Sequence, residues 1–459
     1  MRAAGTAFLL CVPALAFAQP QQPPQASGPL TLPQLQELAR QNDPRAAMAR
    51  AQVDNAQGKR DEVRWSLFPK FETQIAVAGP TPEARFNKSP PDHPTSLLDV
   101  TTGSSRCWFC GDLGIGVGAS VNLVLPLYTF GKYSAGRAAT DHLVGAMSAL
   151  LQRAYDQATF DVTRAYWGYQ TARGARETVV QVRSRISEAR QRAQKLLAEQ
   201  SDQISKSDLM KIDYLAEEIE ARTAEANKSA ALAITGIRLL IGKGPEEPLD
   251  VAQQELPQPP PQPNEDEVLR RALERRPEAR AAAEQVAARR AAVDLERAKL
   301  YPDVALVGGG TFNYTSSADQ PHTPFAYNPY NQRSAYVALG LQATFDIPQK
   351  LARIRQAEAE LRDALAQQRG AEQLVRLEVR QALGDLEEAR QRALRYTTQS
   401  TIGKQLAVQA GLAFDSGLGE ARELLEDVLL WARADGEKFK ALFDAQIAWA
   451  ALQKATGGL

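Results

Sequence analysis

Residues 114–132 read GIGVGASVNLVLPLYTFGK, and this stretch decides the fold. Every odd position from Ile115 to Leu125 is apolar, whereas the even positions before Val124 hold only glycine, serine or asparagine. A period of two is typical of a β-strand with one apolar face. Strands of about ten residues with this pattern can span a membrane in a β-barrel. A turn and a long helical sequence follow from Lys132 onward.

Three further segments carry the same alternation. Residues 71–78 place Phe, Thr, Ile and Val on one face, and residues 337–345 place Val, Leu, Leu, Ala and Phe there. Residues 304–314 are richer in glycine. The sequence therefore predicts four strands in two β-hairpins, at residues 71–126 and 303–346.

The chain also resembles itself. Pro44 and Pro69 recur 233 positions later as Pro277 and Pro302, with an Ala-rich helical run between the prolines of each pair. Residues 243–266 are Pro-rich, which favours an extended strap over a helix. We therefore predict a first repeat over residues 30–242 and a second over 267–459, separated by this strap.

Each repeat is expected to contain one helix before its hairpin, near residues 32–67 and 265–300, and a pair of very long helices after it. The helix pairs cover residues 131–242 and 348–457. Small or apolar residues recur there in steps of three and four, which is typical of a coiled-coil seam. At 1.5 Å per residue, the first helix of a pair would be roughly 100 Å long.

The start of the chain and its composition set limits on function. Residues 1–18 have the short apolar core and Ala-Phe-Ala ending of a secretory signal peptide, and residues 19–29 read as a disordered leader. The later sequence has no window resembling a membrane-spanning helix, so membrane entry would require β-strands. With 54 basic and 54 acidic side chains, the chain lacks the charge that drives nucleic-acid binding.

Four strands cannot close a barrel by themselves. Open strand edges in lipid would leave backbone N–H and C=O groups unpaired, at a cost of several kcal/mol each. Closure must therefore involve several chains, and the sequence by itself does not give their number.

The strand-to-helix junction resembles the hallmark of the TolC family of outer-membrane efflux proteins. The matching residues are Pro126, Leu127, Tyr128, Gly131 and Lys132. The resemblance covers essentially the whole mature chain. It implies an α+β membrane protein, a homotrimer whose twelve-stranded outer-membrane β-barrel continues into a coiled-coil periplasmic tunnel. It also implies partnership with outer-membrane lipid, a periplasmic adaptor (membrane fusion) protein and an inner-membrane pump of the RND or ABC class, in a Gram-negative bacterium.

The same resemblance points to a gate where the second helix pair turns. Phe414 and Gly417 match the family's aromatic-x-x-Gly turn, and Glu423 and Glu426 occupy positions where relatives place pore-facing aspartates. Gly419 departs from the arginine often found there. Alternatively, acidic residues in the first turns of a helix simply complement its dipole.

The turn of the first helix pair matches less closely. The resemblance implies that Asp202, Ser205, Ser207 and Asp208 contribute to adaptor docking, although Asp202 stands where a glycine is expected. Ser205 or Ser207 can equally be an ordinary helix cap.

Cys107 and Cys110 lie in the long first loop. A CxxC motif can be a redox centre, half of a zinc site or a small disulfide. Because no second cysteine pair is present and an exported loop is in an oxidising compartment, we favour a structural disulfide.

We expect no enzyme, cofactor or metal site, because no nucleophile constellation or phosphate-binding loop is present and the chain has only three histidines. The sequence thus favours a passive duct for efflux or type I secretion. A periplasmic coiled-coil protein without channel activity is the alternative, and it would leave the one-sided strands unexplained.

Overall fold

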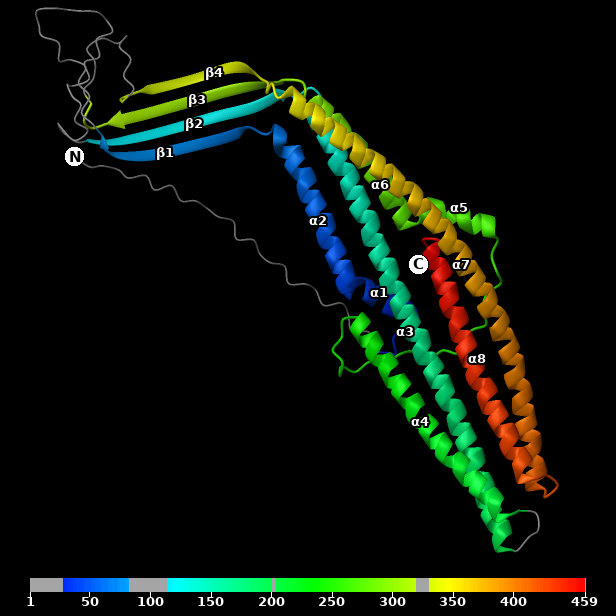
Figure 1. Cartoon of the computed structure of the whole chain (residues 1–459). Coiled ribbons are helices and arrows are strands. Elements are labelled where there is room, and N and C mark those ends of the chain that lie inside the picture. Colours follow the sequence, from blue (N-terminus) through cyan, green and yellow to red (C-terminus); the bar gives the residue numbers. More distant parts are fainter. Residues whose placement is uncertain (1–27, 82–113, 200–203, 319–329, 459) are drawn as a thin grey trace, which may run out of the picture.

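The structure is a computed structural model that describes residues 28–81, 114–199, 204–318 and 330–458. A four-stranded sheet forms one end, and the long helices extend away from it (Figure 1). The predicted signal peptide, most of the leader, Cys107, Cys110 and Asp202 lie outside the described residues.

The sheet is antiparallel, with its strands in chain order: β1 (Lys70–Thr81), β2 (Gly114–Tyr128), β3 (Asp303–Thr315) and β4 (Arg333–Gln342). Its register separates the two predicted faces. One row runs Phe71, Leu123, Gly308, Val337, and the next runs Glu72, Asn122, Gly309, Tyr336. The predicted alternation is confirmed, because the odd positions of β1 and β2 align into one continuous apolar face.

That apolar face is exposed on the protomer. Ile75 is 72% exposed, Val337 75% and Leu339 70%. Neither β1 nor β4 has a second strand partner among the described residues. The sheet therefore presents an uncovered apolar surface and two open edges.

Phe345 was predicted as the last apolar strand position, and this is wrong. β4 ends at Gln342, and Phe345 lies 89% exposed in the link to the next helix. This link is tied to the start of the next helix, since Lys350 Nζ donates a hydrogen bond to the carbonyl oxygen of Thr344 at 2.7 Å.

Four long helices form the body: α3 (Lys132–Ala198), α4 (Lys206–Leu240), α7 (Ile347–Asp415) and α8 (Ala421–Ala455). They agree with the predicted pairs to within a few residues. α4 packs on α3 and α8 packs on α7, while α3 also contacts α8 (Figure 1). None of the helices in the described part of the chain is sufficiently long and apolar to cross a membrane.

The helix expected before each hairpin is in fact two helices. α1 (Leu32–Asn42) and α2 (Pro44–Arg64) are separated at Asp43, and α5 (Glu265–Arg275) and α6 (Pro277–Ala298) at Arg276. Each break precedes a proline, which disfavours a helical conformation in the residue before it. Proline is well tolerated as the first residue of the new helix.

Both breaks are held by an arginine between two carboxylates. Arg45 contacts Asp43 at 2.7 Å and Asp161 of α3 at 2.6 Å. At the second break, Arg276 contacts Glu278 at 3.1 Å and also pairs with Glu378 of α7. The arginine is therefore at the break itself in one case and two residues beyond it in the other.

Most of the Pro-rich strap lies outside helices and strands, and it is tied to the helices. Tyr166 Oη and Gln170 Nε2 on α3 donate to the carbonyl oxygen of Ala252 at 3.2 and 2.7 Å. Gln446 Nε2 on α8 donates to the carbonyl oxygen of Pro257 at 2.9 Å. The strap thus bridges the two helix pairs.

Candidate functional site

The turn between α7 and α8 is built by the end of α7. Gly417 has a positive φ of 73°, and its N–H donates to the carbonyl oxygen of Phe414 at 3.1 Å. The N–H of Leu418 reaches back to the carbonyl oxygen of Ala413 at 2.9 Å. This is the Schellman arrangement, which ends a helix most easily with glycine in the left-handed conformation.

Gly419 has a steric reason to lack a side chain. A Cβ built there would lie 2.8 Å from the Cβ of Ala413. The chain passes directly over the last turn of α7, so a side chain such as arginine would not fit at this position in this conformation.

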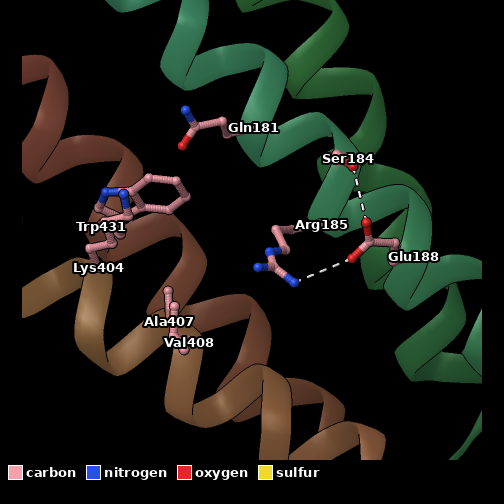
Figure 2. Close-up of a pocket in the computed structure, with 8 residues that line it drawn as sticks. All are labelled: Gln181, Ser184, Arg185, Glu188, Lys404, Ala407, Val408 and Trp431. Carbon is pink, nitrogen blue, oxygen red and sulfur yellow. Dashed lines mark hydrogen bonds and ion pairs between the residues drawn. The ribbon is translucent and has the colours of Figure 1, made fainter.

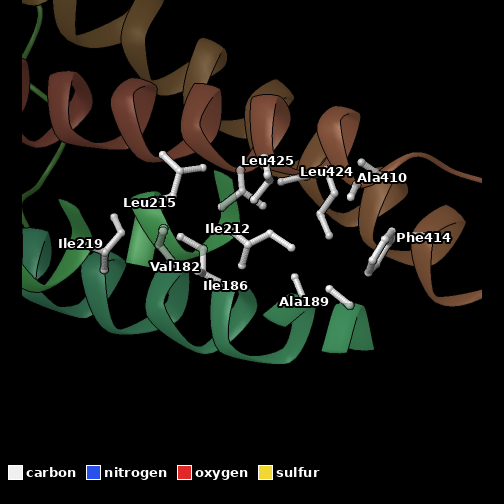
Figure 3. Close-up of a cluster of buried hydrophobic side chains, with 14 of the residues drawn as sticks. Val182, Ile186, Ala189, Ile212, Leu215, Ile219, Ala410, Phe414, Leu424 and Leu425 are labelled. Carbon is white, nitrogen blue, oxygen red and sulfur yellow. The ribbon is translucent and has the colours of Figure 1, made fainter. Parts of the chain in front are cut away.

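Phe414 is buried rather than exposed in the turn. It is 4% exposed and belongs to an apolar cluster contributed by all four long helices. Figure 3 shows Phe414 beside Leu424 of α8, facing Ala189 of α3 and Ile212 of α4. The aromatic position of the turn motif therefore packs the two helix pairs together.

Glu423 and Glu426 lie on the exposed side of α8, one turn apart. Glu426 accepts a hydrogen bond from Arg422 Nε at 2.8 Å, and both side chains are well exposed. Among the described residues, Glu423 has no such cationic partner. The two carboxylates thus lie on the same face of α8, but only that of Glu426 is paired with an arginine.

The start of α4 is capped by Ser205. Its Oγ accepts from the N–H of Asp208 at 3.2 Å, and its own N–H donates to the Asp208 carboxylate at 3.2 Å. The hydrogen bond from Ser205 lowers the pKa of the Asp208 carboxyl. This capping box gives Ser205 and Asp208 the structural role that the sequence left open. Ser207 lies exposed in the first turn of α4.

At the opposite end, the junction from β2 into α3 contains a strained turn. Phe130 has φ 47° and Gly131 φ 89°. Lys132 Nζ lies 2.8 Å from Asp303 at the start of β3. Lys132 therefore joins the first long helix to the strand that opens the other hairpin.

Aromatic side chains collect at this junction. The rings of Phe130 and Tyr301 are stacked with centroids 6.0 Å apart, and Tyr128 meets Phe130 edge-on at 4.6 Å. Trp65 and Phe68 are also exposed there. An aromatic band beside an exposed apolar face is typical of a membrane interface.

Sequence reasoning missed Asp435 on α8. It is buried and accepts hydrogen bonds from Thr178 of α3, Ser400 of α7 and Lys438. The sequence did contain one indication: Asp435 follows Val428 and Trp431 at helical spacing, so it lies on the buried face of α8. Its partners come from three helices far apart in sequence, so the pattern of α8 by itself does not reveal them.

A protein-family model matches the second part of the chain. Residues 268–458 match the family model described as outer membrane efflux protein. No curated protein sequence matches the chain.

Solved structures share the fold over nearly the whole chain. The outer-membrane channel OprN is 22% identical with a TM-score of 0.72, covering 93% of this chain and 90% of that one. VceC from Vibrio cholerae is 17% identical (TM-score 0.69, 93% and 96% covered), and the open state of the Neisseria gonorrhoeae channel MtrE is 19% identical (0.70, 93% and 89%). At these identities the likeness is one of fold.

Proposed function

We propose, from the match of residues 268–458 to the outer membrane efflux protein family model, that the protein is the outer-membrane duct of a tripartite efflux or type I secretion system. It would conduct cargo passively, driven by an inner-membrane pump of the RND or ABC class through a periplasmic adaptor. One observation carries the proposal: an exposed apolar sheet with open edges lies at the end of helices roughly 100 Å long.

The open edges support assembly into a homotrimer. In lipid, the free edges of β1 and β4 need partners, because unpaired backbone groups are costly there. Three copies pairing β4 of one chain with β1 of the next would give a closed twelve-stranded barrel. The apolar face would then contact outer-membrane lipid, and the glycine-rich face would line the lumen.

The matched elements support two structural repeats, over residues 30–242 and 267–459. α3 and α7 have 67 and 69 residues, and α4 and α8 have 35 each. Each chain would contribute two coiled coils, α3 with α4 and α7 with α8. Those of three chains together would continue the barrel as a tunnel through the periplasm.

We assign the gate to the α7–α8 turn. Three-fold symmetry would repeat Glu423 and Glu426 around the axis, and a ring of carboxylates attracts cations. Phe414, Gly417 and Gly419 would hold the turn that presents them. The neighbouring tip, with Asp202, Ser205, Ser207 and Asp208, would receive the adaptor, and Cys107 and Cys110 would form a disulfide in an outer loop.

Two measurements on the mature protein in detergent test this proposal: native mass and conductance in a planar bilayer. We expect a trimer giving small, cation-selective currents that divalent cations block. A water-soluble monomer without conductance would contradict the proposal and favour the periplasmic coiled-coil alternative.

A further inference from the structure

The two open edges of the sheet continue as two open flanks of the helices. The helices beside the sheet follow the order of the strands, since α2 packs on α3, α3 on α6 and α6 on α7. In the described part of the chain, β1 and α2 therefore form one side of this layer, and β4 and α7 form the other (Figure 1). Because β1 runs away from the helices and β4 returns to them, the start of β1 and the end of β4 both lie at the helix side of the sheet.

A notch of about 510 Å³ opens at the start of β1, lined by Trp65, Phe68, Pro69 and Lys70. The rings of Trp65 and Phe68 meet edge-on with centroids 6.0 Å apart, and the guanidinium of Arg64 lies over the Trp65 ring. Both rings are nevertheless more than half exposed. The notch is thus an apolar surface that is already formed in the protomer and is only partly covered by it.

The groove between the two helix pairs differs from this notch in its chemistry. It measures about 410 Å³, and Gln181 and Arg185 of α3 face Lys404 of α7 across it (Figure 2). Ser184 and Arg185 both contact Glu188 there. These polar walls suit a polar partner, whereas the aromatic rings and the proline of the notch suit an apolar side chain.

Phe345 is the matching feature at the other edge of the sheet. Its side chain is 89% exposed in the link between β4 and α7, so the ring has little contact with its own protomer. The hydrogen bond from Lys350 Nζ to the carbonyl oxygen of Thr344 holds this link in place. Burial of an aromatic ring is favourable. A ring held out from the edge in this way therefore indicates a partner outside the protomer.

The two features also carry opposite charges, which attract. Lys70 lines the notch, and Asp346, which pairs with Lys350 at 3.4 Å, directly follows Phe345. Pairing β4 of one chain with β1 of the next would bring Asp346 and Lys70 to the same end of the shared edge. Pairing of like edges would instead offer a notch to a notch, or a ring to a ring.

We propose that Phe345 of one copy inserts between Trp65 and Phe68 of the next copy, in a head-to-tail contact where the sheet meets the helices. This inference rests on the proposed homotrimer and deepens it, because it names side chains that join neighbouring chains. A head-to-tail contact repeated around a three-fold axis closes on itself. It fixes α7 of one chain beside α2 of the next at the point where strand pairing ends.

Thiol crosslinking in membranes tests the contact directly. The parent chain carries Cys107→Ser and Cys110→Ser, so that only introduced cysteines react once the predicted signal peptide is removed. The double variant Phe68→Cys/Phe345→Cys is treated with a short bismaleimide, which joins two thiols without an oxidant, and is run on a denaturing gel. We expect covalent dimers and trimers, because the two positions lie at opposite edges of one chain and meet only between chains.

The controls separate this contact from general proximity and from misfolding. Each single variant should remain monomeric on the gel. Phe68→Cys/Leu418→Cys should do so as well, because Leu418 is equally exposed but lies in the α7–α8 turn. Without crosslinker, Phe345→Ala should lower the temperature at which the native trimer dissociates, and Phe345→Leu should lower it less. Since Phe345 is exposed on the protomer, these changes remove little packing within the chain.

The remaining outcomes would refute the contact. Only monomers on the gel, from a double variant with the native mass of a trimer, would show that Phe345 lies against lipid or another surface. That result would overturn the contact and leave the proposed channel standing. Covalent dimers from Phe345→Cys as the single variant would show that like edges meet, and would overturn the head-to-tail arrangement. A parent chain with the native mass of a monomer would instead refute the proposed function on which the contact rests.

Discussion

Glu423 and Glu426 share the exposed face of α8 but differ in their neighbours. The i−4 residue of Glu426 is Arg422, and the two form an ion pair. This pairing was foreseeable from helical spacing, whereas the burial of Phe414 was not, because it depends on three other helices. Sequence motifs thus located the turn, and tertiary packing decided what each of its residues contacts.

We expect Glu423→Gln to weaken divalent block more than Glu426→Gln does, because Arg422 already offsets part of the charge of Glu426. Loss of one carboxylate from each chain of a three-fold ring should raise the blocking concentration several-fold. Bilayer conductance with added Mg²⁺ or Co²⁺ measures this. Glu217→Gln, which removes an exposed carboxylate from α4, serves as control, and an equal effect of all three variants would refute the gate assignment.

Asp156 on α3 gives a prediction on stability. Burial raises the pKa of its carboxyl, although Gln152 donates to it at 2.8 Å. The charged form is therefore disfavoured in the folded state at neutral pH. We expect Asp156→Asn to raise Tm at pH 7 by on the order of one or two degrees, with the gain fading as the pH falls and Asp156 becomes protonated.

The control for this pH dependence is Asp43→Asn. The hydrogen bond from Arg45 lowers the pKa of Asp43, so its contribution to stability is present above pH ~4 and is lost as the pH falls through the lowered pKa. Asp43→Asn should therefore lower Tm at pH 7 and have less effect in acid. Thermal unfolding at several pH values follows both variants, and shifts of the same sign would contradict the assignment.

At the scale of elements, the long helices were predictable because a seam sustained over many turns leaves little choice of secondary structure. The breaks at Asp43 and Arg276 were missed because a proline at the first helical position leaves the apolar pattern on both sides intact. The end of β4 was missed because Phe345 continues the alternation beyond Gln342, the last residue that pairs with β3. The strap was predicted to be extended, but its ties to Tyr166, Gln170 and Gln446 involve distant helices.

The capping box of α4 yields a prediction for that helix. Ser205→Ala removes the acceptor for the N–H of Asp208, which we expect to cost about 1 kcal/mol locally. Hydrogen exchange should become faster over the first turns of α4 and remain unchanged in α8. Ser207→Ala, one residue into the helix, is the matched control. Equal protection in both variants would show that the cap contributes little to the tip.

For the whole molecule, the sequence indicated an open sheet that needs partners. Solved structures share this fold over more than nine-tenths of the chain. In the proposed assembly, the number of chains and the width of the gate would be set by surfaces that meet only between chains. The sequence pattern of a single chain therefore does not predict the number of chains or the width of the gate.

Two adjacent positions in β4 test which face meets lipid. Leu339 belongs to the apolar face and Ala338 to the opposite one. Arginine at a lipid-facing position near the bilayer centre costs about 2–4 kcal/mol. Leu339→Arg should therefore reduce the amount of trimer recovered from outer membranes, and Ala338→Arg should be tolerated. Immunoblots of membrane fractions measure both, and the reverse order would invert the assignment of the two faces.

The charges at the two helix breaks bear on how the two proposed repeats would diverge. At one break the order is Asp43 then Arg45, and at the other Arg276 then Glu278, yet each arginine also reaches a carboxylate on the adjacent long helix. Replacing Arg276 alone by an acidic residue would place three carboxylates together, with Glu278 and Glu378. A change from one arrangement to the other by single substitutions would therefore pass through an intermediate with like-charge repulsion. Substituting the arginine and its acidic partner together would preserve the ion pair, although the residue identities at the two breaks would no longer match. For the proposed repeats, similar ion pairs would therefore reveal corresponding positions better than residue identity does.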